Sequence, residues 1–185
     1  MSDLELERKF IVGDYGVLVG ASDNITQFYP LVGNSVSVRL RLTESGGLQT
    51  TLKSRHDGIA RKEVESVLPL TEEERLDLMS GSKAPSGRIT KRRYLGDLAS
   101  PIGTWLIDEF GGDNKGLVVA EFEISKETIE KNGAQKAIEL LGALEIPTWC
   151  GAEVTDDFRF RNEYLALNPF TKWPPQDRKE FDRYG

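Results

Sequence analysis

Apolar and polar side chains alternate along several short stretches of the chain, and a period of two is typical of β-strands whose faces meet different surroundings. The clearest stretch is 36–43, where aliphatic residues hold every even position and polar residues every odd one. Similar alternation predicts strands near 5–10, 25–29, 48–53, 61–66, 89–95, 104–110 and 117–124. Pro30 is expected to end the strand at 25–29, because proline cannot donate to a sheet ladder.

Helices are predicted between and after these strands. Thr71 and Glu74 have the spacing of a capping box, and the helix that follows would place Leu76 and Met79 on its inner side. A second helix is predicted from the N-cap residue Ser125 towards position 141, and a third shortly after position 155. The strands and helices together predict an α+β fold.

Each predicted strand has a charged face, and neighbouring charges on one face mostly share their sign. These pairs are Glu5/Glu7, Arg39/Arg41, Glu63/Glu65, Lys91/Arg93 and Glu121/Glu123. Any single pair fits an ordinary solvated face. A surface sheet would gain from mixed signs, however, because opposite charges across strands contribute roughly 0.2–1 kcal/mol and like charges cost about as much. Segregation by sign favours a face whose counter-charges come from a ligand or a metal.

The physical picture is an antiparallel sheet, closed or nearly closed, with its charged face inside and helices packed on its apolar outer face. The inward basic candidates are Lys9, Arg39, Arg41, Lys53, Arg61, Lys91 and Arg93. The inward acidic candidates are Glu5, Glu7, Glu63, Glu65, Asp108, Glu121 and Glu123. The two sets balance, so the outside would carry the whole formal net charge of -6.

Composition narrows the possible functions. With 185 residues, 38% hydrophobic, the chain suits one globular domain, and its net charge of -6 argues against a protein that coats nucleic acid. One cysteine allows no internal disulfide, and one histidine allows no histidine pair. With no apolar signal segment and no apolar run of about 18 residues, we expect a soluble cytoplasmic protein without a membrane partner.

Separate acidic and basic clusters in one cavity suit a polyanion carried with divalent metal. Carboxylates hold Mg²⁺ or Mn²⁺, while Arg and Lys bind the remaining phosphate oxygens. A metal-activated water and charge neutralisation at the transferred phosphoryl group are enough for hydrolysis without a protein nucleophile. The chain has no P-loop and no nucleophile triad, which agrees with this chemistry.

The motifs resemble those of the CYTH superfamily, the triphosphate tunnel metalloenzymes. Over about residues 3–167 they follow the family's order: Glu5-Leu6-Glu7-Arg8-Lys9, Gln27-Phe28-Tyr29, Val38-Arg39-Leu40-Arg41, Thr51-Leu52-Lys53, Arg61-Lys62-Glu63-Val64-Glu65, Lys91-Arg92-Arg93-Tyr94, Trp105-Leu106-Ile107-Asp108-Glu109-Phe110, Gly116–Glu123 and Glu153-Val154-Thr155. Two departures, Phe28-Tyr29-Pro30 after the glutamine and Arg92 between two basic residues, fall at the expected tunnel mouth and remove no core motif residue.

The resemblance implies a closed eight-stranded antiparallel barrel formed by residues 1–167. It leaves 168–185 as a tail, which we expect to pack on the barrel through Trp173. It implies metal binding by Glu5, Glu7, Glu121 and Glu123, with Glu63 and Asp108 in supporting or metal-linked roles. The resemblance implies phosphate binding by Arg39, Arg41, Lys53, Lys91 and Arg93. Arg61 is added to this set because it is one of the inward-facing basic residues. Lys9 would lie near the scissile phosphate, so Lys9, Glu5 and Glu7 are the catalytic candidates.

The expected activity is metal-dependent hydrolysis of a triphosphate at its terminal phosphoanhydride, with inorganic tripolyphosphate ahead of a nucleoside or thiamine triphosphate. The first alternative is a class IV-type adenylate cyclase that converts ATP to cyclic AMP and pyrophosphate. It needs an adenine pocket, for which Phe28, Tyr29 and Trp105 are aromatic candidates. The second is a triphosphate sensor that does not cleave. The expected partner is a small triphosphate, and a homodimer is possible.

Overall fold

The account below covers the residues that the computed structural model describes, which are 3–12, 20, 22–33, 35–43, 47–54, 60–80, 87–96, 100–179 and 181. Within these ranges nothing is said of a few side chains, among them those of Arg61 and Met79. The predicted roles of those two side chains therefore stay untested.

The described strands form one antiparallel sheet. They are β1 (Asp3–Val12), β2 (Ser22–Val32), β3 (Val36–Thr43), β4 (Leu48–Ser54), β5 (Ala60–Leu68), β6 (Arg88–Leu95), β7 (Gly103–Phe110), β8 (Val118–Ile124) and β9 (Cys150–Glu153). The order is β5-β4-β3-β2-β6-β7-β8-β1-β9, and β1 also pairs with β5. This last pairing closes the first eight strands into a barrel, which confirms the predicted fold class.

β2 is longer than the sequence predicted. It continues through Pro30 to Val32, so the expectation that proline ends this strand was wrong. The register between β2 and β3 shifts between Phe28 and Leu31, which places Pro30 in an irregular stretch of the ladder. A proline is tolerated at such an irregularity because no regular ladder bond is required of it.

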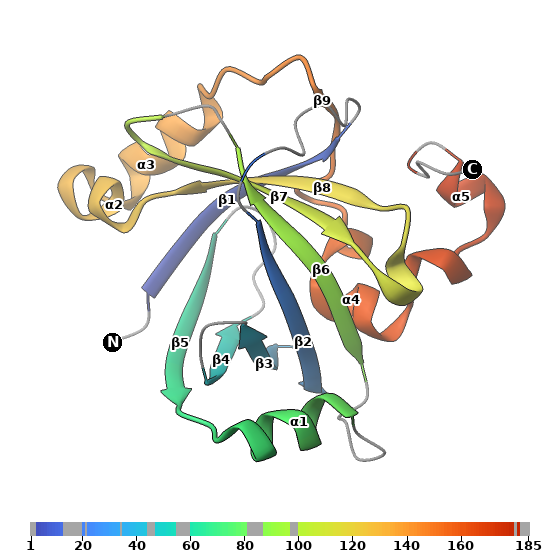
Figure 1. Ribbon diagram of the computed structural model, residues 1–185. Coiled ribbons are helices and arrows are strands. Elements are labelled where there is room, and N and C mark those ends of the chain that lie inside the picture. Colours follow the sequence, from blue (N-terminus) through green and yellow to red (C-terminus); the bar gives the residue numbers. More distant parts are fainter. Residues whose placement is uncertain are drawn as a thin grey trace.

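The helices connect and cover the strands (Figure 1). They are α1 (Glu72–Ser80), α2 (Lys126–Asn132), α3 (Ala134–Gly142), α4 (Asn162–Leu167) and α5 (Pro175–Arg178), with short 3-10 turns η2 (Gly112–Asn114), η3 (Phe158–Phe160) and η4 (Phe170–Lys172). Figure 1 shows α1 crossing one end of the barrel, with α2 and α3 to one side and α4 and α5 to the other. In the described part of the chain, no helix is long and apolar enough to span a membrane.

Two of the three predicted helix starts, at Thr71 and Ser125, are confirmed. The third was placed too early, because the 3-10 turn η3 occupies 158–160 and the helix α4 begins only at Asn162. The Thr71 hydroxyl accepts a bond from the Glu74 amide at 3.3 Å, and the Glu74 carboxylate accepts one from the Thr71 amide at 2.8 Å. The prediction that Leu76 faces inward was wrong, because this side chain is 56% exposed. α1 follows β5 and crosses one end of the barrel (Figure 1), and there Leu76 is left largely exposed among the residues that the structure describes.

The single helix predicted from Ser125 is in fact two. Ser125 caps α2, accepting from the Thr128 amide at 3.1 Å, as expected. Gly133, with a φ of 80°, then separates α2 from α3. A positive φ breaks the helical path and is favourable only for glycine, so the break lies where the sequence placed a weak point.

Two apolar clusters build the core. One lies on the outer face of β1, β7 and β8, where Phe10, Trp105 and Phe122 pack against Leu141 of α3. The other fills one end of the barrel. There Ile11 and Val119 continue the inner rows of β1 and β8, and Phe170 from the C-terminal segment packs against them. This second cluster, the apolar plug, lies at that end of the barrel against β1, β2, β6, β7 and β8.

Candidate active site inside the barrel

Lys9 stands at the centre of the charged interior. It lies on β1 directly opposite Glu121 of β8, and its ammonium group forms ion pairs with the carboxylates of Glu121 and Glu7, the latter at 2.9 Å. All three side chains are buried. Burial alone would raise the pKa of Glu121, but Lys9, Arg93 and Lys91 outweigh it and hold this pKa well below its usual range. Glu121 is therefore ionised and fixes the position of Lys9.

The network continues from Glu121 to the β6–β7 wall. Arg93 donates to Glu121 at 2.9 Å and clamps Asp108 with two bonds of 2.7 and 2.6 Å. Lys91 also pairs with Asp108, which is 1% exposed. Burial opposes ionisation of Asp108, yet Lys91 and Arg93 together lower its pKa below the ordinary value. Asp108 thus holds two cations in place on the inner face.

The opposite wall carries a second set of pairs. Lys53 binds Glu63, with Glu5 at 3.7 Å, and Arg39 donates to Thr51 at 2.9 Å and to Glu65 at 3.1 Å. Arg41 donates to Gln27 at 3.0 Å. Basic groups therefore line both walls of the interior.

Some polar atoms on this wall lack a partner. The Nε of Arg39, the Nε2 of Gln27 and the Oγ of Ser37 are buried and make no hydrogen bond. Burial, together with the neighbouring cations Arg39 and Arg93, lowers the pKa of Arg41 to about 10. Unused donors beside mutually repelling cations are suited to an anion with many oxygen atoms.

Carboxylates gather nearer the other end of the barrel. Glu7 lies directly opposite Glu123 across the β1–β8 pair, an unfavourable position for two like charges. Burial raises the pKa of Glu123 to about 7, and Glu5, Glu7 and Glu121 contribute to the rise. A divalent cation would relieve this repulsion, and carboxylate oxygens are its preferred ligands.

The carboxylate oxygens of this cluster suit a divalent cation chemically, but they are not arranged around a common point. Within the described ranges, no three acidic, histidine or cysteine side chains already converge as a metal site. Lys9 holds Glu7, and Lys53 lies beside Glu5, so these carboxylates would have to turn towards an ion. The donors Glu5, Glu7 and Glu123 fit Mg²⁺ or Mn²⁺ on that condition.

The acidic end also has a small opening. A cavity of about 80 Å³ lies there, lined by Leu4, Glu5, Glu63, Glu65, Glu123, Ile124 and Lys126. Two of them, Leu4 and Glu5, lie on β1 at the opposite end from Ile11 of the apolar plug. Burial, and then Glu5, raises the pKa of Glu63. The carboxylates therefore lie at the end of the interior that is remote from the apolar plug.

The structure brings the predicted site residues together on one inner face, and it extends the list. Arg61 pairs by backbone register with Glu5, and its side chain lies outside the described set. Sequence reasoning missed Gln27 and Ser37 as interior polar groups, as well as Thr155, whose hydroxyl contacts the Lys9 backbone. Gln27 and Thr155 lie within quoted motifs, but neutral side chains carry no charge signal.

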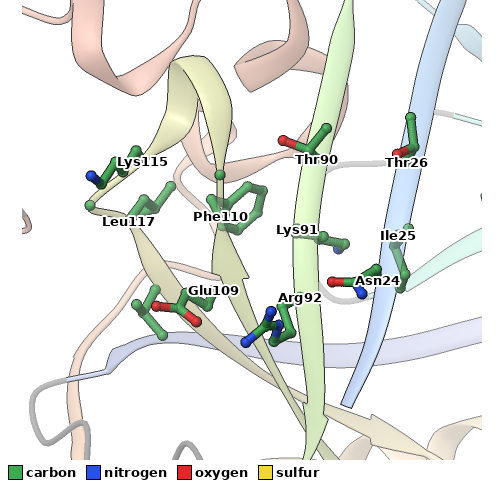
Figure 2. Close-up of a pocket in the computed structure, with 13 residues that line it drawn as sticks. Asn24, Ile25, Thr26, Thr90, Lys91, Arg92, Glu109, Phe110, Lys115 and Leu117 are labelled. Carbon is green, nitrogen blue, oxygen red and sulfur yellow. The ribbon is translucent and has the colours of Figure 1, made fainter. Parts of the chain in front are cut away.

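A larger cavity of about 390 Å³ lies elsewhere, over β2, β6 and β7 (Figure 2). Its polar lining includes Asn24, Thr26, Thr90, Arg92, Glu109 and Lys115. On β6, Thr90 and Arg92 alternate with Lys91, so most of this lining belongs to the outer face of the sheet. This larger cavity lacks the carboxylate cluster and is not the candidate active site.

Comparison with known proteins agrees with this geometry. No family model matches the chain. An inorganic triphosphatase of Acetivibrio thermocellus is 33% identical over 168 residues, covering 90% of this chain and 95% of the relative. One from Nitrosomonas europaea is 33% identical over 166 residues, covering 89% and 97%. The chain belongs to the inorganic triphosphatase family. A crystal structure of an inorganic triphosphatase matches with a TM-score of 0.57 and 29% identity, covering 88% of this chain and 94% of the other. The resemblance drawn from the motifs is confirmed.

Proposed function

We propose that this protein hydrolyses a triphosphate at its terminal phosphoanhydride, with inorganic tripolyphosphate as its preferred substrate and Mg²⁺ or Mn²⁺ as cofactor. The observation that carries the proposal is the enclosed interior, where unpaired buried donors of Arg39 and Gln27 face a cluster of mutually repelling carboxylates. The names of the two similar relatives support the same activity.

The basic residues would bind the phosphate chain. Arg39, Arg41 and Lys53 reach it from one wall, and Lys91 and Arg93 from the other. Arg61, which pairs with Glu5 by backbone register, stays a candidate on the sequence alone. Arg guanidinium groups suit phosphate because they donate two parallel bonds in a fixed plane. Lys9, held between Glu7 and Glu121, would lie beside the scissile bond and stabilise the charge that develops there.

The carboxylates divide into two roles. Glu5, Glu7 and Glu123 would hold the metal, because their mutual repulsion is the feature that a cation relieves. Glu63 and Asp108, expected in supporting roles, would keep the Lys and Arg side chains in position through their ion pairs. We assign the same role to Glu121, which the resemblance had placed among the metal ligands, because it pairs with Lys9 and Arg93. A bound divalent cation supplies charge neutralisation at the phosphate oxygens and a more acidic water.

The aromatic residues favour an inorganic substrate over a nucleotide. Trp105 is 2% exposed and packs on the outer face of the barrel against Phe10 and Phe122. Phe28 is fully buried, and Tyr29 belongs to the apolar plug. None of these three candidates is placed in the charged interior to stack on a base, so no observation here favours the cyclase alternative.

A direct assay tests the proposal. Tripolyphosphate, ATP and thiamine triphosphate are incubated side by side with Mg²⁺ or Mn²⁺, and phosphate and nucleotide products are resolved. We expect phosphate release, fastest from tripolyphosphate and abolished by chelator. Cyclic AMP with pyrophosphate would make the protein a cyclase, and tight binding without turnover would make it a sensor.

A pair of variants assigns the activity to the interior. Glu7→Gln removes one carboxylate of the cluster and is expected to lower metal-dependent turnover by orders of magnitude while the fold persists. Glu139→Gln is the matched control, because Glu139 lies on the exposed surface of α3 and pairs with Lys136 there. Near-normal turnover in Glu7→Gln would contradict the metal assignment.

A further inference from the structure

The larger cavity, of about 390 Å³, lies over the outer face of β2, β6 and β7, and we call it the outer cavity. Two rows of polar side chains form its floor, and Figure 2 shows them side by side. In the first row, Asn24 of β2 lies opposite Arg92 of β6, which in turn lies opposite Glu109 of β7. In the second row, Thr26 lies opposite Thr90. The floor therefore offers hydrogen-bond donors and acceptors at neighbouring positions.

Glycines of the β7–β8 connection leave space beside the second row. The Gly111 amide donates to the Thr90 carbonyl at 2.9 Å, so the connection passes close to β6. A Cβ atom at Gly111 or at Gly112 would lie only 3.2 Å from the Thr90 hydroxyl oxygen. Gly112 also has a φ of 58°, which other residues rarely adopt. A larger side chain at either position would crowd the hydroxyl, whereas glycine leaves room for a ligand there.

The rest of the connection forms a fixed rim. Asn114 is 1% exposed, and its side chain accepts from the Phe170 amide at 2.8 Å. The carbonyl of the preceding Asp113 accepts from the Thr171 hydroxyl at 2.7 Å. Lys115, which lines the outer cavity, follows directly. Because the C-terminal segment already holds this rim in place, a ligand would lose little binding energy in ordering it.

The outer cavity has an excess of positive charge, although the formal net charge of the chain is -6. Its ionisable side chains on the outer side are Arg92, Lys115 and Glu109. Lys91 also borders the cavity, but its ammonium group pairs with Asp108 of the interior. Two cations and one anion leave one positive charge, and a concave positive site on an acidic protein concentrates small anions.

The volume and the neutral groups indicate what else the anion carries. A water molecule takes about 30 Å³ in the liquid, so the outer cavity has room for about a dozen and exceeds the needs of a bare inorganic anion. Its volume is that of a site for a small organic molecule. Asn24, Thr26 and Thr90 can each donate and accept, and Glu109 accepts. Hydroxyl groups, which also donate and accept, match this floor.

We propose that the outer cavity binds a small polyhydroxylated anion. Its acidic head pairs with Arg92 and Lys115, and its hydroxyl groups bond to Asn24 and to the two threonines of the floor. The head is a carboxylate, as in a sugar acid, or a phosphate ester, as in a sugar phosphate, because arginine and lysine bind both. Glu109 opposes a more highly charged chain such as tripolyphosphate, so this site differs in selectivity from the barrel interior.

The proposal does not rest on the proposed function. On β6, Thr90 and Arg92 of the outer cavity alternate with Lys91 and Arg93, whose side chains pair with Asp108 in the interior. Loss of the outer site is therefore expected to leave turnover of tripolyphosphate unaltered. A failure of either proposal is seen independently of the other.

NMR titrations of the isotope-labelled protein test the outer site directly. Glucuronate, glucose phosphate and uncharged glucose are added in turn, and the backbone amide signals of Gly111 and Gly116 are followed. We expect saturable shifts with at least one of the two anions, and the tighter one identifies the head group. Glucose should bind at least about tenfold more weakly, because it lacks the charge. The absence of saturable shifts with both anions, or equally tight binding of glucose, would overturn the proposal.

Three variants locate the bound anion. Lys115→Ala and Thr90→Val are each expected to raise its dissociation constant, by about tenfold for the lost charge and by less for the lost hydroxyl. Lys136→Ala is the matched control, because the Lys136 side chain is 58% exposed on α3, away from the cavity, and should bind the anion as before.

An interior variant excludes the alternative location. Arg39→Gln removes a cation of the barrel interior and is expected to leave the shifts of Gly111 and Gly116 unchanged. If Arg39→Gln abolishes these shifts while Lys115→Ala preserves them, the anion occupies the interior and the outer site is wrong.

Discussion

At the residue scale, the backbone of Lys9 is held at a junction in the sheet. β5 pairs with β1 as far as Leu6, and β9 takes over from Phe10. Between them, the Lys9 amide donates to the Thr155 hydroxyl at 3.0 Å, and the Lys9 carbonyl accepts from the Val154 amide at 2.9 Å. The hydroxyl of Thr155 thus provides the hydrogen-bond acceptor that a neighbouring strand would otherwise provide for the Lys9 amide.

Thr155→Val keeps the shape of this side chain and removes the acceptor. Exchange of the Lys9 amide proton, followed by NMR on protein labelled at lysine, is expected to accelerate because the amide loses its bond. Turnover is expected to fall about ten- to a hundredfold through kcat more than KM, because Lys9 is displaced relative to the scissile bond.

Two control variants distinguish a displaced Lys9 from a general disturbance of the fold. Thr155→Ser retains the hydroxyl and should restore both slow exchange and turnover. Thr171→Val removes a hydroxyl that donates to the Asp113 carbonyl on the surface, and should change neither. Unaltered amide exchange in Thr155→Val would show that Thr155 does not secure Lys9.

Glu123 makes stability depend on pH. Its pKa rises from 4.5 to about 7 on folding, chiefly through burial and then through Glu5 and Glu7. The folded state therefore binds the proton more tightly than the unfolded one, so this stabilisation is complete below about pH 4.5 and is lost as pH rises through about 7. We expect the free energy of unfolding to fall over that window by up to about 3 kcal/mol from this group.

Denaturant titrations across pH check this expectation. Glu123→Gln, which cannot ionise, should flatten the decline between pH 4.5 and 7 relative to the unaltered protein. Mg²⁺ competes with the proton for the same carboxylates, so it should raise the melting temperature more at pH 8 than at pH 5, and less in Glu123→Gln. Parallel curves for the two proteins would contradict the assignment.

At the element scale, two helix caps with similar chemistry are expected to matter unequally. Ser125 caps α2, and α2 leads into α3, which packs on the outer core through Leu141. Thr71 caps α1, whose Leu76 is largely exposed. Ser125→Ala should therefore lower the free energy of unfolding by about 1 kcal/mol. Thr71→Ala should lower it by less, because α1 can fray without disturbing the core. Equal losses in chemical denaturation would show that α1 is coupled to the core.

The strands and helices also show which parts of the fold could be predicted from the sequence. A period of two survives bending and twisting, so the alternation at 36–43 and in the other strands predicted the charged inner face of a closed or nearly closed sheet, while the eight-stranded closed barrel followed from the family resemblance. Leu76 was assigned wrongly because helical spacing identifies a face but not whether another element covers it. The division at Gly133 and the strand through Pro30 depend on a positive φ and on a register shift, which pairing between distant segments decides.

The same limit applies to the site. Like-signed pairs such as Arg39/Arg41 and Glu121/Glu123 stand out in a sequence because two like charges on one face are costly without a counter-charge. Gln27 and Thr155 are neutral, and their roles follow from which strand lies beside them. Those neighbours come from residues far away in the chain, so only the folded barrel identifies them.

At the scale of the whole molecule, the interior changes from charged to apolar along its axis. On β1, Glu5, Glu7 and Lys9 are followed on the same inner face by Ile11, which belongs to the apolar plug. Phe170 completes the plug from the C-terminal segment. Water excluded at that end lowers the local dielectric and strengthens the ion pairs around Lys9. The plug and the charged network are thus consecutive parts of one interior.

Phe170→Ala tests that coupling. The side chain is fully buried and packs at 5.2 Å, ring centre to ring centre, on Trp173, while its amide donates to Asn114 at 2.8 Å. Truncation leaves a cavity and should lower the free energy of unfolding by about 3–5 kcal/mol, measured by chemical denaturation. Phe158→Ala is the control, because Phe158 is 55% exposed and its truncation should cost far less.

Below the melting temperature, Phe170→Ala should also reduce turnover, since water entering beside Ile11 weakens the ion pairs that fix Lys9. Full turnover in a destabilised Phe170→Ala protein would show that the plug serves stability alone.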